Sequence, residues 1–183
     1  MQAGLLGCIT QPGQRNPLPS GVRYCCDNGV FGAYLGDAKW WEWLSSRPDK
    51  DRCEFAVAPD VVGDAAATLA RSRPWLPRIR SLGIPAAFVA QDGQENLPVP
   101  WGEFDVLFIG GTTEFKLGVG ARALIGEAVV RGIPVHMGRV NSRKRLAYAF
   151  TAGCASVDGT YLKFGPDLNL PKLLRWIDEI HAA

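Results

Sequence analysis

The strongest constraint on this chain is the alternation of short apolar runs with segments of helical pattern. The runs 55–58, 85–90 and 105–109 are apolar along almost their whole length. Strands without polar alternation are typical of parallel sheets that are buried on both faces. The segments between the runs supply the helices that cover such a sheet. The sequence therefore predicts an α/β protein with parallel strands inside and helices outside.

Seven strands can be placed along the chain. Pro74 and Pro77 interrupt the second helical segment, which predicts a kink or two short helices there. Gly132 is expected to end the third helix, and 94–103 has room only for a loop or one helical turn. The predicted strands are 4–10, 22–26, 55–58, 85–90, 105–109, 135–137 and a run from Ala155 that ends at Asp158; the predicted helices are 31–46, 64–82, 120–131, 142–152 and 170–181.

This element order fits either an open doubly wound sheet or a (β/α) barrel. The chain has 183 residues, fewer than a full eight-stranded barrel usually needs. We therefore expect one catalytic domain, residues 1–183, built as a compact or incomplete TIM-type barrel. An eighth strand would be absent, short or hidden near a terminus.

Composition limits the binding partners, cofactors and cellular location that can be expected. The net charge of +2 is too small to indicate nucleic-acid binding by itself. The five cysteines show neither a C-x-x-C pair nor the spacing of a metal site, which favours reduced thiols in a cytosolic protein without a metal or other cofactor. No apolar run is long enough for a membrane span, and the amino terminus lacks the charged head of a signal peptide. A soluble, cytoplasmic protein is expected.

Polar residues and glycines follow nearly every predicted strand. In a parallel sheet the carboxyl ends of all strands lie on one face, where binding sites are assembled. Turn chemistry alone would also place Asp and Gly there, but it does not readily account for three separate carboxylates, a glutamine and a Gly-Gly pair. We predict a ligand site on this face. It contains Asp27, Asn28, Asp60, Gln91, Gly110, Gly111, Gly138, Arg139 and Asp158.

These residue types suit a purine-like base. A guanine edge offers two N–H donors and one carbonyl acceptor, which match a carboxylate and a glutamine amide or backbone N–H groups. Two further carboxylates could share covalent and acid–base chemistry at a glycosidic carbon. Phe31 and Met137 could stack on a flat ring, or they could simply fill the core.

Other residues have two interpretations each. His136 lies inside an apolar strand, which favours a core histidine over a ligand. The basic residues at the start of the helical segment 142–152 could bind phosphates or form a solvated charged turn. The candidates for phosphate contacts are Arg139, Arg143, Lys144, Arg145 and Lys163.

Several of these segments together resemble a known family. Their order and spacing are similar to those of the tRNA-guanine transglycosylase (queuine tRNA-ribosyltransferase) superfamily. The segments Gly110–Gly118 and Gly138–Ser142 are closer to its DNA-modifying branch, found in phages and bacterial genomic islands, which inserts 7-deazaguanines into DNA. The matching segments are Cys26–Phe31, Ala58–Asp60, Val89–Gly93, Ile109–Gly118, His136–Ser142 and Ser156–Thr160.

The resemblance implies a role for each matching residue. Asp158 would be the nucleophile that attacks the sugar C1′ of a flipped nucleotide, and Asp27 the general acid/base. Asp60 would bind the N1/N2 edge of the base, whereas Gln91 and the amides of Gly110 and Gly111 would bind its carbonyl. Phe31 and Met137 would hold the ring between them. Asn28 and Gly138 belong to the same substrate pocket.

The chain departs from the family in one important respect. The tRNA enzymes carry a carboxy-terminal zinc site of three cysteines and a histidine, and no matching spacing is found here. The resemblance therefore implies DNA in preference to tRNA, with a purine or 7-deazapurine base as the second substrate, in a bacterial or phage-infected host cytoplasm and with a homodimer as one arrangement. The expected activity is base exchange. The alternatives are a DNA glycosylase, a nucleotide-level glycosyl hydrolase or transferase, a binding module without chemistry, and an unrelated small-molecule barrel enzyme.

Overall fold

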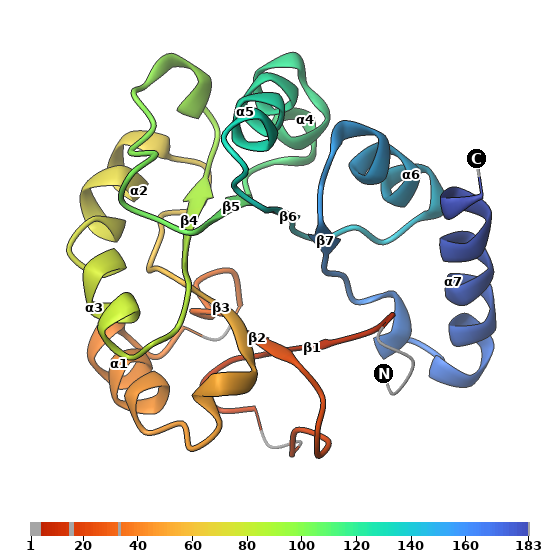
Figure 1. Cartoon of the computed structure of the whole chain (residues 1–183), viewed down its shortest axis with the longest axis horizontal. Coiled ribbons are helices and arrows are strands. Elements are labelled where there is room, and N and C mark those ends of the chain that lie inside the picture. Colours follow the sequence, from red (N-terminus) through yellow and green to blue (C-terminus); the bar gives the residue numbers. More distant parts are fainter. Residues whose placement is uncertain (1–4, 15–16, 33, 183) are drawn as a thin grey trace.

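A computed structural model describes residues 5–14, 17–32 and 34–182. Its centre is a seven-stranded sheet in which every neighbouring pair is parallel and the strand order follows the chain, β1 to β7. Helices lie outside the sheet (Figure 1). The strands are β1 Cys8–Thr10, β2 Tyr24–Cys26, β3 Cys53–Val57, β4 Ala86–Ala90, β5 Val106–Ile109, β6 Val135–Met137 and β7 Ser156–Val157.

The sheet curls into a half-barrel. Within the described ranges β1 and β7 each pair with a single neighbour, so both are edge strands. The predicted α/β architecture with seven parallel strands and outer helices is confirmed. Most strands match the predicted positions, although β1 and β7 are shorter than predicted. The start of the first predicted strand, Gly4, lies outside the described residues.

The helices differ from prediction mainly at their ends. The segment 64–82 forms two helices, which is one of the two predicted outcomes. The first helix begins at Asp37 and not at Phe31, because Gly36 takes a positive φ of 96° that is incompatible with helix. The last begins four residues early, after Gly165. The helices are α1 Asp37–Ser45, α2 Ala65–Ser72, α3 Leu76–Ser81, α4 Thr113–Leu117, α5 Val119–Val130, α6 Arg143–Ala152 and α7 Pro166–His181, with 3-10 turns η1 Lys50–Arg52, η2 Gln94–Asn96 and η3 Tyr161–Lys163.

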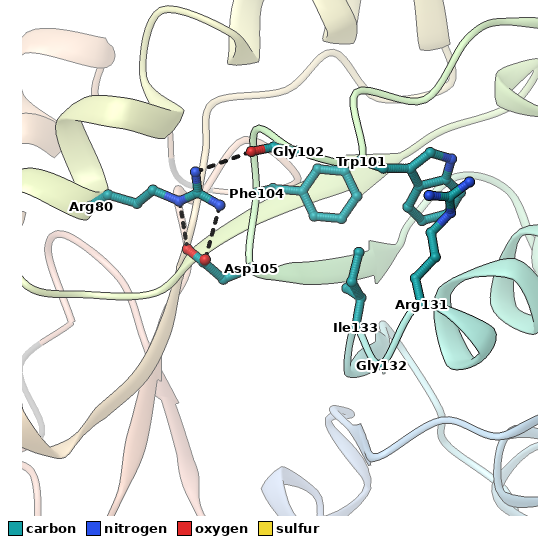
Figure 2. Close-up of a pocket in the computed structure, with 8 residues that line it drawn as sticks. All are labelled: Arg80, Trp101, Gly102, Phe104, Asp105, Arg131, Gly132 and Ile133. Atoms are coloured by element: carbon teal, nitrogen blue, oxygen red, sulfur yellow. Dashed lines mark hydrogen bonds and ion pairs between the residues drawn. The ribbon is translucent and has the colours of Figure 1, made fainter.

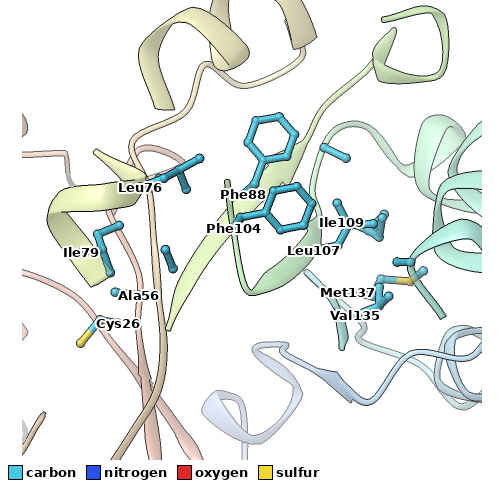
Figure 3. Packing of buried hydrophobic residues seen from close by; sticks show 14 of the residues in the cluster. Cys26, Ala56, Leu76, Ile79, Phe88, Phe104, Leu107, Ile109, Val135 and Met137 are labelled. Carbon is cyan, nitrogen blue, oxygen red and sulfur yellow. The ribbon is translucent and has the colours of Figure 1, made fainter. Parts of the chain in front are cut away.

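Alternation along the strands divides the buried residues between two faces. Leu107, Ile109, Val135 and Met137 belong to the large cluster between the sheet and the helices (Figure 3). Residues on the opposite, concave face form a smaller cluster of Phe55, Val57, Ala87, Val89 and Val106, with Cys25 and Phe108 packed against it. The concave face is therefore lined by apolar side chains. The register pairs Phe108 with His136 and His136 with Ser156, which extends this face to the edge strand β7.

The described part of the chain holds no helix that combines the length and the apolarity needed to cross a bilayer.

Candidate functional site

Asp158 follows β7 and its backbone is fixed on both sides. Its N–H donates to the carbonyl of Met137 at 3.1 Å, and its own carbonyl accepts the N–H of Val140 at 2.6 Å. One carboxylate oxygen, Oδ1, lies 3.2 Å from Nε2 of His136 and 3.3 Å from the amide nitrogen of Arg139. The side chain remains 22% exposed. Both contacts fall on the same oxygen, so the carboxylate is held at one end and can present the other to a substrate.

Asp60 is the centre of a buried hydrogen-bond network. Asn28 donates from Nδ2 to one carboxylate oxygen at 2.7 Å, and Gln91 donates from Nε2 to the other at 2.5 Å. Asn28 also donates to the carbonyl of Ala58, and the Gln91 oxygen accepts the N–H of Gly63. All three side chains are at most 6% exposed. Burial raises the pKa of Asp60, while the hydrogen bonds from Asn28 and Gln91 and the nearby Arg71 oppose that rise.

Asp27, directly after β2, has a raised pKa. The pKa of Asp27 is raised to about 6, mainly by burial and also by the charges of Asp158 and Asp60, while hydrogen bonds from the amides of Gly29 and Asn28 oppose the rise. Asp27, Asp60 and Asp158 follow β2, β3 and β7, so the parallel sheet places all three residues at its carboxyl edge. Their convergence around one ligand stays a prediction.

The glycines of the site allow close approach. A Cβ on Gly110 would lie 2.6 Å from Val89 and 3.0 Å from Nε2 of Gln91, and one on Gly138 would lie 2.8 Å from the Phe108 ring. The Gly110 amide is not available to a ligand, however, because it donates to the carbonyl of Ala90 at 3.0 Å as part of the sheet. The prediction that this amide binds a base carbonyl is wrong. Gly111, with a φ of +73°, is the residue of the pair at which the chain turns out of the sheet.

Met137 and Phe31, the two predicted stacking residues, lie in different environments. Met137 is 1% exposed and belongs to the cluster between sheet and helices, because odd-numbered residues of β6 face outward. The structure therefore assigns it to the core, the alternative that the sequence left open. Phe31 is 63% exposed, and the Arg139 guanidinium lies 4.1 Å from its ring centroid. Its ring is available for stacking.

The basic candidates differ in their surroundings. The Arg139 side chain donates to the carbonyl of Gly111, and its φ of +59° is the left-handed conformation. Arg143 pairs with Glu179 at 2.9 Å. Lys144 and Lys163 are exposed, while Arg145 is partly buried. Of these residues, Arg139 is the one that contacts the carboxylate site.

Lys116 is a site residue that the sequence analysis missed. It is 3% exposed, and its Nζ donates to the carbonyl of Gly138 at 2.7 Å. Burial lowers the pKa of Lys116 to about 8, helped by the charges of Arg139 and Arg145; Asp158 and Asp92 act in the opposite direction. The residue lies in α4, a helix that was not predicted. The sequence signal for this helix is Thr112, a residue type that favours the start of a helix. In the structure its hydroxyl accepts the Phe115 N–H.

His136 also belongs to the site and not only to the core. Its ring packs on Phe55 and Phe108, with centroid distances of 5.1 and 4.7 Å. Its two nitrogens contact Ser156 and Asp158. The sequence favoured a core histidine, and the structure adds a polar contact at each end of the ring. The alternating direction of residues along β6 and β7 places all three side chains on the concave face.

Gly159 is required by the turn that carries Asp158. A Cβ there would lie 2.5 Å from the carbonyl oxygen of Val140 and 2.5 Å from the side-chain oxygen of Asn141, which itself accepts the Thr160 amide at 2.7 Å. We expect Gly159→Ala to lower the free energy of unfolding by about 1–3 kcal/mol, because backbone cannot move aside as a side chain can. Urea unfolding followed by tryptophan fluorescence measures this change.

A matched control lies in α5. A Cβ on Gly126 would meet nothing within 4 Å, so Gly126→Ala should raise stability by roughly 0.5–1 kcal/mol through helix propensity. Equal unfolding curves for Gly159→Ala and the unsubstituted protein would show that the close contact at Gly159 is not restrictive.

Two cavities are found elsewhere on the molecule. One of about 480 Å³ lies before β5 and β6, among Arg80, Trp101, Asp105 and Arg131 (Figure 2). This is the opposite edge of the sheet from the carboxylates. The other, of about 300 Å³, lies on the same edge as the carboxylates and is lined by Asp92, Thr112 and residues of α4. Neither of these two cavities is lined by Asp27, Asp60 or Asp158.

No known protein-family model matches the chain, and no curated protein matches it either.

Proposed function

We propose that the protein cleaves an N-glycosidic bond in DNA and exchanges a guanine-type base for a 7-deazaguanine-type base through Asp158. The observation that carries this proposal is that Asp27, Asp60 and Asp158, from three distant parts of the chain, follow the carboxyl ends of the parallel strands β2, β3 and β7 and so belong to the same edge of the sheet. The resemblance of their flanking segments to the tRNA-guanine transglycosylase superfamily supports it. We further propose that the half-barrel is an incomplete TIM-type barrel.

In the proposed reaction, the second carboxylate oxygen of Asp158, Oδ2, attacks C1′ of a nucleotide extruded from the duplex. A C1′–O bond forms and the C1′–N bond breaks, with its electron pair going to the departing base. Asp27 gives that base a proton. The incoming base then attacks C1′, returns a proton to Asp27 and releases Asp158. Asp27 suits both roles, because a pKa of about 6 makes either protonation state accessible near neutral pH.

Asp60 would accept hydrogen bonds from the N–H donors of the base. Both of its oxygens are already engaged by Asn28 and Gln91, so the base would use their remaining lone pairs. The amide of Gly111 would take the carbonyl-binding role. Phe31 would cover one face of the base. Met137 is buried in the core and therefore has no role in the proposed pocket.

A DNA glycosylase is the second candidate, since the same exposed edge of Asp158 would serve it. Water would then take the place of the incoming base. DNA labelled in guanine, incubated with and without free 7-deazaguanine bases, separates the two activities. Exchange predicts release of label that is coupled to incorporation of the deazapurine. Release without incorporation would support the glycosylase, and no release from single-stranded or duplex DNA would contradict both.

A further inference from the structure

The contact between His136 and Asp158 is the last link of a hydrogen-bond chain across the concave face. Nδ1 of His136 lies 2.8 Å from Oγ of Ser156, and Nε2 lies 3.2 Å from Oδ1 of Asp158. The register explains the alignment, because His136 and Ser156 are direct partners in the β6–β7 pair. Asp158 is two residues beyond Ser156 and so points to the same face.

The chemistry of the three groups sets the direction of these hydrogen bonds. An ionised carboxylate only accepts, so Nε2 of His136 carries the hydrogen. In a neutral ring the other nitrogen is then an acceptor, and the Ser156 hydroxyl donates to it. Phe55 and Phe108 hold the ring plane in place. The ring is 3% exposed, so water does not compete for Nε2.

We infer that His136 and Ser156 are positioning residues that fix the nucleophilic carboxylate of Asp158, an inference that rests on the proposed function. Asp158 sets the histidine tautomer, the Ser156 hydroxyl supports that tautomer by donating to Nδ1, and His136 fixes the orientation of the carboxylate. Together with the Arg139 amide, His136 occupies Oδ1. The other carboxylate oxygen, which attacks in the proposed reaction, then keeps one orientation before C1′ of the sugar binds. A small error in the position of a reacting group is costly in rate.

Two substitutions at His136 separate positioning from simple packing. His136→Phe keeps an aromatic ring among Phe55 and Phe108 but removes the donor. We expect kcat for base release to fall about 100-fold, with KM and the thermal midpoint nearly unchanged. His136→Gln places an amide nitrogen where Nε2 was, and it should recover most of the lost kcat. Ser156→Ala should lower kcat by less than His136→Phe does. Ser156→Thr keeps the hydroxyl and should have nearly the kcat of the unsubstituted protein.

A second measurement does not depend on activity. The chain has two histidines, His136 and His181, so their ¹⁵N signals are readily distinguished. We expect His136 in the Nε2–H tautomer, with Asp158→Ala shifting its signals and leaving those of the exposed His181 unchanged. The same spectra of Ser156→Ala should show the tautomer preference weakened.

The outcomes distinguish the inference from the proposed function. If the unsubstituted protein releases no base, the proposed function fails, and the ¹⁵N spectra still decide whether the hydrogen-bond chain exists. If it is active and His136→Phe matches its kcat, or if His136 is in the Nδ1–H tautomer, the inference is overturned. Labelling of Ser156 by a fluorophosphonate would also overturn it, because His136 would then be activating a serine nucleophile.

Discussion

Asp158→Asn should abolish base release and base exchange. The replacement keeps the side-chain shape and an oxygen that can accept from His136 and the Arg139 amide, as Oδ1 does now. It removes the negative charge and replaces the free oxygen by an amide nitrogen, which cannot attack C1′. Because no covalent intermediate can form, we expect kcat to fall on the order of 10⁴-fold or more.

Denaturing gel electrophoresis of the protein with labelled DNA measures this directly. The unsubstituted protein should give a slower-migrating band that carries the label, and Asp158→Asn should give none, while both bind DNA alike in a gel-shift assay. Asp167→Asn, on the exposed start of α7, is the matched control and should behave as the unsubstituted protein does. Equal turnover by Asp158→Asn would exclude Asp158 as the nucleophile.

Asp27→Asn should make the protein more stable and far less active. In the folded protein the pKa of Asp27 is about 6, above the ordinary value of 3.8. The stability associated with protonated Asp27 is therefore present below about pH 4 and is lost as pH rises through about 6. The shift of about two units corresponds to roughly 3 kcal/mol. The asparagine carries no charge. At pH 7.5 the free energy of unfolding of the variant, measured by urea unfolding, should therefore be higher by up to about 3 kcal/mol.

The same substitution removes the proton donor of the proposed reaction. We expect kcat to fall by a factor of about 10²–10⁴. In the unsubstituted protein kcat should decline above about pH 6 when departure of the base limits the rate, and this decline should vanish in Asp27→Asn. Asp51→Asn, at an exposed position in η1, should change neither stability nor rate. A stability difference that is as large at pH 4 as at pH 7.5 would contradict the titration of Asp27.

The architecture could be predicted from the sequence because the strands are buried on both sides. A continuous apolar run such as Phe88–Ala90 predicts a strand that is buried on both faces, and the structure buries all of it. The carboxyl ends of the strands then place Asp27, Asp60 and Asp158 on one edge, and no knowledge of side-chain positions is needed for that step.

What could not be predicted depends on contacts between distant residues. Met137 and His136 are neighbours in one strand, and only the register decides which of them faces the helices and which the site. Lys116 resembles any surface lysine in the sequence, and its burial against the Gly138 carbonyl follows from the packing of α4 on the sheet. The resemblance implied that the Gly110 amide binds a ligand, but this amide donates to the carbonyl of Ala90 in the neighbouring strand, a pairing that the sequence does not reveal.

The strand order of the half-barrel has a consequence for synthesis on the ribosome. Each strand pairs with the one made immediately before it, so the sheet can grow at one edge as the chain emerges, with amino-terminal parts forming first. The residues proposed to bind the base, which follow β2 to β4, are then made early, whereas Asp158 arrives with the seventh strand. The emerging polypeptide thus gains the proposed nucleophile only after the six preceding strands have been made.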